Sequence, residues 1–326
     1  MRPFFLCLSA SAAATTHHFN SHLEARQSNG SIQIAIVNKC PDVIWPGIAE
    51  NDGESSDGFE LAPGSNRTIS VAADWKGRIW GRTNCTFPNG ENLPGNCLTG
   101  ECGALKCRQA GNPPATLAEF DMYGAAEQAY YDISLVDGYN LPMAIVLEPN
   151  NVPTLANVKL SDKIPSCVGS IDGFASAADF NPYSNNQQFL GTSNTDQLPF
   201  ETKTTAQFIG SWCPFDLLVA PPKVPGNGVY PYPDGNIKRP DFSPCNSACQ
   251  KYGRAKYCCT GRYDRGNCDP NYYAKAAKAV CPDAYSYPHD DTKSVFGVAR
   301  GGNWQVVFCP GGRSTNILAT VAGKAS

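Results

Sequence analysis

Three carboxylates and two arginines lie on or just beyond the predicted strands at 78–83, 119–122 and 131–135 and could together form a chemical site. The carboxylates are Glu119, Asp132 and Asp137, and the arginines are Arg78 and Arg82. Two neighbouring carboxyl groups cannot both ionise cheaply, so their pKa values separate. A protonated acid beside an ionised one can hydrolyse a glycosidic bond, because the acid protonates the leaving oxygen. The alternative is that the same carboxylates only hydrogen-bond sugar hydroxyls while an arginine neutralises a structural acid, and this binding role is favoured.

The roles within such a site can be divided by sequence context. Glu119 is flanked by apolar residues that would desolvate it and raise its pKa, so it is the candidate general acid. Asp137, and after it Asp132, would be the base or nucleophile, kept ionised by Arg78 or Arg82. These arginines are four residues apart on a predicted strand and share a face. Asp137 lies in a turn five residues beyond Asp132, so a bend must bring the two together.

Other chemistries find little support in the sequence. It contains no G-x-S-x-G elbow and no H-E-x-x-H motif, and His289 is the only histidine beyond the N-terminal region, which disfavours a Ser-His-Asp triad. No phosphate-binding glycine loop or dinucleotide fingerprint is present, so no cofactor is expected. The net charge of −3, with 17% charged residues, excludes nucleic acid and anionic membranes as expected partners.

The cysteines point to disulfides. Fourteen of the 15 run from Cys40 to Cys309, and Cys7 lies in the first apolar run. An even count at this density is typical of an oxidising compartment. The alternative is a zinc site, but the chain has no C-x-x-C pair and few histidines, so no metal is expected.

The N-terminus has the layout of a signal peptide. Residues 1–26 predict a signal peptide with a short pro-segment ending near Arg26, and hence a secreted, extracellular protein. The apolar run is too short to cross a bilayer, and no later segment reaches about 18 uninterrupted apolar residues, so no membrane span is expected. Three sequons, at Asn29, Asn66 and Asn84, are permitted glycan sites. The Asn84 sequon is the least favoured, because it contains Cys85.

The elements that must position these residues are short strands. Alternating apolar residues over 32–36, with further runs at 68–71, 78–83, 119–122, 131–135, 143–147 and 304–308, predict a mostly β domain with an antiparallel sandwich or barrel core. A short helix is expected over 271–280, with Pro270 in its first turn. Residues 168–212 and 214–244 are predicted to be long loop insertions, and 311–326 a short C-terminal tail.

Six stretches in order carry a family resemblance. Between about residues 32 and 310 the chain resembles the thaumatin-like proteins, the family of osmotin and thaumatin. The stretches are GRIWGRT at 77–83, ATLAEF at 115–120, YDISLVDGYNLPM at 131–143, YCC at 257–259, CPDAYSYP at 281–288 and VFCP at 307–310. The resemblance implies one thaumatin-like domain over 27–310, with an antiparallel β-sandwich core and a disulfide-rich, partly helical region. The leader resembles that of a fungal member.

The resemblance also implies a disulfide pairing that spacing alone does not give. Both halves of the family's usual eighth bridge are missing here, so no thiol is stranded. The implied pairs are Cys40–Cys309, Cys85–Cys97, Cys102–Cys107, Cys167–Cys281, Cys213–Cys245, Cys249–Cys258 and Cys259–Cys268.

The site implied by the resemblance is an acidic cleft between the β core and the cysteine-rich region. It would be lined by Arg78, or alternatively Arg82, with Glu119, Asp132, Asp137 and Asp290, the last chosen over Asp283 and Asp291. Tyr131 and Tyr139, among aromatics that also include Tyr130, Tyr285 and Tyr287, would contact sugar faces.

The function implied is that of a monomer acting on β-1,3-glucan or another wall polysaccharide. It would bind the polymer or act as a weak endo-β-1,3-glucanase, in an antifungal or wall-remodelling role. The alternative is a non-enzymatic defence or wall protein whose cleft binds a protein or polysaccharide partner.

Overall fold

The computed structural model describes residues 30–50, 55–88, 95–169, 212–219, 244–311 and 314–324. The predicted leader, the Asn29 sequon and most of the two predicted loop insertions lie outside these residues. No helix in the described ranges is long and apolar enough to cross a membrane.

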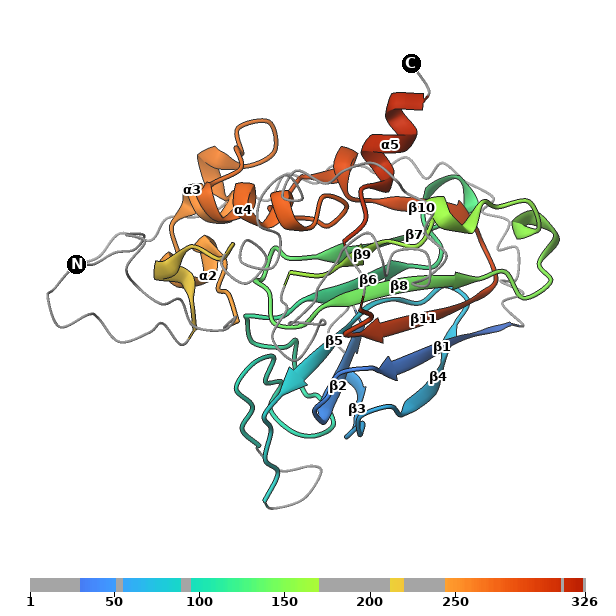
Figure 1. The fold of residues 1–326 in the computed structure, drawn as a ribbon, viewed down its shortest axis with the longest axis horizontal. Coiled ribbons are helices and arrows are strands. Elements are labelled where there is room, and N and C mark those ends of the chain that lie inside the picture. The colour runs from blue at the N-terminus through green and yellow to red at the C-terminus, as the bar shows by residue number, and fades with distance from the viewer. Residues whose placement is uncertain are drawn as a thin grey trace, which may run out of the picture.

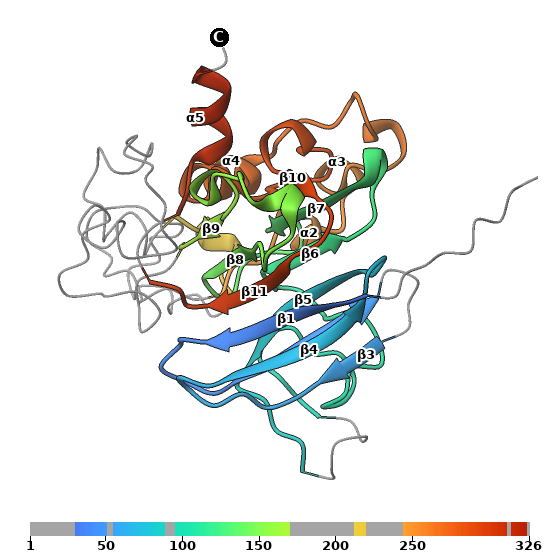
Figure 2. The same ribbon diagram turned by 90° about the vertical axis from the view of Figure 1, so that its right-hand side faces the viewer.

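Two β-sheets form the body of the protein (Figures 1 and 2). The first sheet has the strand order β4-β1-β11-β8-β9 and is antiparallel except where β1 runs parallel to β11. Because β1 is the first strand in the chain and β11 is the last, their pairing joins the two ends of the folded domain. Their bounds are β1 Ser31–Asn38, β4 Asn66–Ala72, β8 Met143–Glu148, β9 Ser166–Cys167 and β11 Asn303–Phe308.

The second sheet is antiparallel throughout and carries the candidate site. Its strand order is β10-β7-β6-β5-β2-β3. The prediction of a mostly β, antiparallel-rich fold is confirmed, although β2, β3, β9 and β10 had no clear sequence signal. The strands are β2 Ile44–Glu50, β3 Ser55–Gly58, β5 Lys76–Thr83, β6 Leu117–Asp121, β7 Gln128–Ser134 and β10 Phe296–Ala299.

The core lies between the inner faces of the sheets. Along β1 every second residue is buried, with Ile34 and Ile36 fully inside, as the alternation predicts. Trp304 on β11 meets Phe120 on β6 with ring centroids 5.6 Å apart and Tyr131 on β7 at 4.6 Å, so aromatic contacts join one sheet to the other. Residues adjacent to these along β6 and β7 must therefore point out of the core.

Short helices gather at one end of the strands, in the cysteine-rich region (Figure 1). They are α2 Ala248–Tyr252, α3 Ala255–Cys258 and α4 Tyr272–Val280. The side chain of Asn271 accepts a hydrogen bond from the Ala274 amide and caps α4. Pro270 therefore precedes the helix rather than occupying its first turn, which corrects the prediction by one to two residues.

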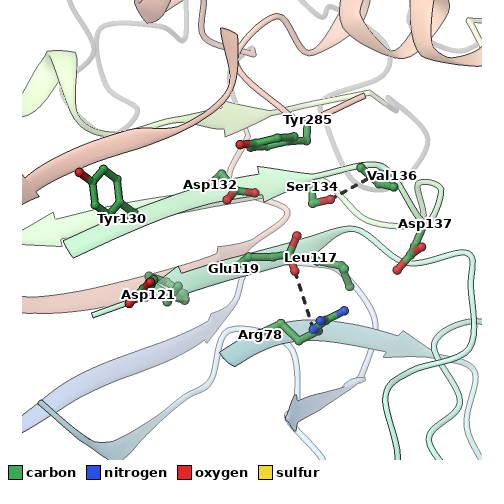
Figure 3. A pocket seen from close by; sticks show the side chains of 11 residues that line it. Arg78, Leu117, Glu119, Asp121, Tyr130, Asp132, Ser134, Val136, Asp137 and Tyr285 are labelled. Carbon is green, nitrogen blue, oxygen red and sulfur yellow. Dashed lines mark hydrogen bonds and ion pairs between the residues drawn. The ribbon is translucent and has the colours of Figure 1, made fainter. Parts of the chain in front are cut away.

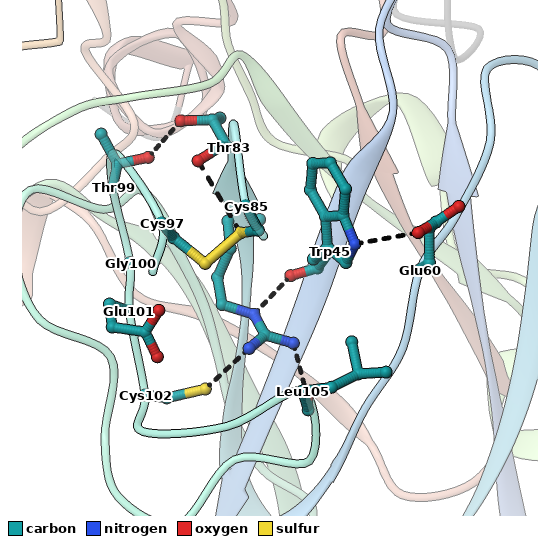
Figure 4. Close-up of a disulfide and its surroundings, with 12 residues drawn as sticks. Trp45, Glu60, Thr83, Cys85, Cys97, Thr99, Gly100, Glu101, Cys102 and Leu105 are labelled. Carbon is teal, nitrogen blue, oxygen red and sulfur yellow. Dashed lines mark hydrogen bonds between the residues drawn. A yellow bond between two sulfur atoms is a disulfide. The ribbon is translucent and has the colours of Figure 1, made fainter. Parts of the chain in front are cut away.

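Seven disulfides account for all fourteen cysteines from Cys40 to Cys309. The pairs are the ones that the family resemblance implies. Cys40–Cys309 ties β1 to the end of β11, and Cys167–Cys281 ties β9 to the end of α4. Figure 4 shows Cys85–Cys97 beside the loop that carries Glu101, Cys102 and Leu105.

The predicted C-terminal tail contains a helix, α5 (Ile317–Lys324), that projects from the body in both views (Figures 1 and 2). Its first turn is anchored by buried Asp283, whose carboxylate accepts hydrogen bonds from the amides of Ile317 at 2.7 Å and Leu318 at 3.0 Å. An acid at a helix N-terminus satisfies amides that have no partner within the helix. Asp283 is thus a structural residue, not a cleft residue.

Candidate functional site

The outward face of β5, β6 and β7 carries three cross-strand rows of side chains. Antiparallel pairing places directly opposed residues on the same face, with their Cβ atoms about 4.5–5.5 Å apart. The first row is Lys76, Asp121 and Tyr130; the second is Arg78, Glu119 and Asp132; the third is Trp80, Leu117 and Ser134. Most of these residues line a cleft with a volume of about 390 Å³ (Figure 3).

The second row brings together three of the predicted site residues. Arg78 Nε lies 3.7 Å from Glu119 Oε1, and both side chains are about one-third exposed. Asp132 stands opposite Glu119 on the far side from Arg78. Arg78 therefore contacts Glu119 directly, and its charge also acts on Asp132 beyond it.

A turn after β7 brings Asp137 to the same cleft. The Gly138 amide donates to the Leu135 carbonyl at 3.0 Å, and Gly138 has φ +100°. A Cβ atom there would lie 2.5 Å from the Cys245 carbonyl oxygen, so both the conformation and the space require glycine. The bend that the sequence required between Asp132 and Asp137 is present, and Asp137 faces the row from the side (Figure 3).

The wall on the cysteine-rich side is built by Tyr285. Its backbone bridges β7, because its amide donates to the Ile133 carbonyl and its carbonyl accepts from the Leu135 amide. The Tyr285 hydroxyl donates to Asp291 at 2.9 Å, and Arg265 pairs with the other oxygen of Asp291 at 3.2 Å. The chain Arg265–Asp291–Tyr285 thus fixes one rim of the cleft.

Desolvation raises the pKa of Glu119, Asp132 and Asp137. The pKa of Asp132 lies well above its usual value, first because of desolvation and then because of the charges of Glu119 and Asp291. Desolvation also raises the pKa of Glu119, against the lowering effect of Arg78, while Asp137 raises it further. The pKa of Asp137 is raised by desolvation as well, and Arg78 opposes this. Desolvation therefore favours the protonated form of each of these acids, whereas the charge of Arg78 favours the ionised form.

One carboxyl oxygen in the cleft forms no hydrogen bond with the described residues. Asp132 Oδ1 is buried and has no hydrogen-bond partner among the described residues. Buried polar atoms are nearly always satisfied, so an orphan oxygen in a cleft is a position where a ligand hydroxyl would be bound favourably.

Arg82 does not reach the cleft, so its prediction as an alternative cleft arginine is wrong. It shares a face with Arg78, as expected, but the loop closed by Cys102–Cys107 covers it completely. Its guanidinium donates to the carbonyls of Trp45 at 2.8 Å, Ala104 at 2.7 Å and Leu105 at 2.6 Å. Burial lowers its pKa to about 10, which still leaves it charged at neutral pH.

Tyr131 and Tyr139 are core residues, which corrects their prediction as sugar contacts. Tyr131 is 1% exposed because it alternates with Asp132 and so faces the other sheet. Tyr139 is fully buried and packs edge-on against Trp212. The cleft tyrosines are Tyr130 and Tyr285 instead.

Asp290 lies outside the acidic cleft. It is buried beside α4, where it pairs with Lys278 at 2.6 Å and accepts from the Ser286 hydroxyl at 3.1 Å. It lines a separate cavity of about 690 Å³ between α4, α5 and the 282–293 segment. Of the three acids weighed at this position, Asp291 is the one that contacts the cleft wall. Within the described ranges, no group of three or more His, Cys, Asp or Glu side chains is placed to hold a metal ion.

Comparison with known proteins identifies the family. The Thaumatin family model matches residues 38–310. The chain is 33% identical over 289 residues to thaumatin-like protein 1 of Arabidopsis thaliana, covering 85% of each chain. It is 33% identical over 276 residues to pathogenesis-related protein 5 of the same plant, covering 84% of this chain and 88% of the relative.

A solved structure, that of the thaumatin-like xylanase inhibitor TLXI, shares 31% identity and covers 34% of this chain and 74% of its own. The TM-score of 0.30 is too low for this structure to indicate how the site of the present chain is built. The family model, the two relatives and the disulfide pairing all indicate the same family. The chain belongs to the thaumatin family.

Proposed function

We propose that this protein is secreted and binds β-1,3-glucan of fungal cell walls in the cleft above β5, β6 and β7, with weak endo-hydrolysis as a second activity. The observation that carries the proposal is the cross-strand row of Arg78, Glu119 and Asp132, with Asp137 facing it. The similarity to relatives named as pathogenesis-related proteins supports a role in defence.

Binding follows from the polarity of the cleft. Carboxyl oxygens accept hydrogen bonds from sugar hydroxyls, and Asp132 Oδ1 has a free position for one. Tyr130 and Tyr285 stand at the margins of the row, where their rings can contact apolar sugar faces (Figure 3). The volume of about 390 Å³ lies in the range of about 300–1,000 Å³ for small-ligand sites.

Hydrolysis requires one acid that donates a proton and one carboxylate that is ionised. In this proposal Glu119, whose pKa is raised by burial, protonates the glycosidic oxygen as the bond to the sugar C1 breaks. Asp137 supports the positive charge that develops at C1, either as nucleophile or as the base that activates water. Asp132 stays protonated and holds a sugar hydroxyl.

A specific observation favours the alternative of binding without hydrolysis. The ion pair between Arg78 and Glu119 stabilises ionised Glu119 and so opposes its use as an acid. In that case the cleft would bind a polysaccharide or protein partner and leave its bonds intact.

Incubation of the purified protein with soluble β-1,3-glucan tests these two roles. Binding is measured by isothermal titration calorimetry and cleavage by the release of reducing ends, with a soluble β-1,4-glucan as the control polymer. Binding with new reducing ends supports hydrolysis, and binding alone supports the second role. If the protein neither binds nor cleaves β-1,3-glucan, the glucan proposal is wrong.

A further inference from the structure

A cluster of tyrosines and cations lies on the cysteine-rich region, outside the acidic cleft. We call it the tyrosine–cation patch and define it by Tyr252, Tyr257, Tyr272, Arg254 and Lys256. The Tyr257 ring lies between the other two, with centroids 5.9 Å from Tyr252 and 6.3 Å from Tyr272. Tyr252 is 41% exposed and Tyr272 is 39% exposed, although large aromatic side chains in this protein are mostly buried.

The patch is held in a fixed arrangement before any ligand binds. The hydroxyls of Tyr252 and Tyr272 both donate to Asp216 Oδ2, at 2.5 Å and 2.6 Å. The disulfides Cys249–Cys258 and Cys259–Cys268 close the short segment that carries α2 and α3. A surface that is ordered in advance loses less conformational entropy when it binds.

The cations of the patch lie on its aromatic rings. Lys256 Nζ is 4.8 Å from the centroid of Tyr257, and the Arg254 guanidinium carbon is 5.8 Å from that of Tyr252. In the described part of the chain, neither cation forms an ion pair with a carboxylate. Residues 248–265 contain five Lys and Arg but only one Asp, in a protein whose net charge is −3. With Asp216 also counted, cations still outnumber carboxylates here, so the patch is a local positive surface on a protein whose net charge is negative.

The positive charge of the patch indicates which class of ligand it would bind. Tyr and Arg are enriched in protein–protein interfaces, but Lys is depleted there, so Lys256 and the excess of cations over residues 248–265 favour a polyanion over a protein partner. A polyanion is favoured because several of its charges bind together and release counterions. Each cation lies over an aromatic ring, so the patch offers a charge for a carboxylate beside ring edges for an apolar sugar face. This combination fits a sugar unit that carries its own carboxylate.

We propose that the tyrosine–cation patch binds an anionic polysaccharide whose sugar units carry carboxylates. The uronate carboxylates pair with Arg254 and Lys256, and the sugar rings contact the exposed edges of Tyr252 and Tyr272. The patch is separate from the residues that line the acidic cleft, so this binding does not depend on the proposed glucan function.

The test uses the full-length protein and a fluorescently labelled oligogalacturonate as the probe. Fluorescence anisotropy should give an affinity that falls steeply between about 50 and 200 mM salt. The double variant Arg254→Ala/Lys256→Ala should bind at least about tenfold more weakly at low salt, with a shallower salt dependence. The matched control Lys39→Ala/Lys106→Ala removes the same charge from exposed positions elsewhere and should bind like the parent protein.

A third variant separates the rings from the charge. Tyr252→Ala keeps every cation and should still weaken oligogalacturonate binding, while Tyr272 keeps its own bond to Asp216. The proposal is overturned if the parent protein does not bind the probe or if the control variant loses as much affinity as the patch variant. It is also overturned if single-stranded DNA or polyphosphate binds more tightly than the oligogalacturonate, since the patch would then serve another class of polyanion.

Discussion

Glu119 and Asp132 stand directly opposite each other on β6 and β7 and face the same cleft. Like charges at directly opposed positions of a sheet are destabilising. The pair persists because Arg78 lies on the other side of Glu119 and because burial keeps the pKa of Asp132 high. Two directly opposed carboxyl groups lower the stability of a sheet, so their presence indicates that these positions serve a function.

The first prediction concerns Glu119→Gln, which keeps the shape of the side chain but cannot donate the acidic proton. If the cleft hydrolyses glucan, turnover should fall by at least about a hundredfold while binding stays nearly unchanged. Release of reducing ends and calorimetric binding measure the two effects separately. Asp121→Asn is the matched control, because Asp121 lies in the same cleft but is paired with Lys76 at 2.9 Å. Normal cleavage by folded Glu119→Gln would show that another group is the acid.

The second prediction concerns the pH dependence of stability through Asp132. Its pKa in the folded protein is raised above the value of 3.8 expected for an unfolded chain. The folded state therefore binds this proton more tightly, and stability is lost as pH rises through the folded pKa. Asp132→Asn removes that loss, so it should have little stabilising effect near pH 3 and a growing one toward neutral pH.

Thermal unfolding of Asp132→Asn and the parent protein across this pH range measures the effect. Asp121→Asn should show no such gain, since it breaks an ion pair with Lys76. A difference between Asp132→Asn and the parent that shrinks as pH rises would contradict the assignment of a raised pKa.

The third prediction contrasts two arginines on β5. Arg82→Met leaves several buried carbonyls without their donor and should lower the free energy of unfolding by roughly 3 kcal/mol. Arg78→Met removes a partly exposed ion pair and should cost no more than about 1 kcal/mol. Guanidinium denaturation with the disulfides intact compares them. Equal losses of stability in the two variants would contradict the structural role of Arg82.

The fourth prediction concerns N-glycosylation in a eukaryotic secretory host. Asn66 begins β4, the edge strand of its sheet, and both Asn66 and Thr68 are exposed, so a glycan has room there. Asn84 has φ +48° and is followed by the Cys85–Cys97 bridge, which constrains the sequon. Peptide mass spectrometry should therefore find a glycan on Asn66 and none on Asn84. Thr68→Ala should abolish it, and an unmodified Asn66 in secreted protein would refute the assignment.

The sequence determined the strand framework and the acids that can share a face. The alternation through 32–36 and the runs at 78–83, 119–122 and 131–135 became β1, β5, β6 and β7. Because side chains alternate along a strand, each of Arg78, Glu119 and Asp132 must point to one of the two faces of the sheet. The seven disulfides agree with those that the family resemblance implies, although the cysteine spacing alone leaves the pairing open.

The tertiary structure decided which positions on a face are covered. Arg78 and Arg82 share one face of β5, yet the loop closed by Cys102–Cys107 buries only Arg82. Asp290, Tyr131 and Tyr139 likewise look like site residues in sequence but are buried in the structure. Local sequence sets the direction of a side chain, whereas its exposure depends on segments that fold over it from elsewhere in the chain. For that reason the sequence alone could name the acids of the cleft but not its limits.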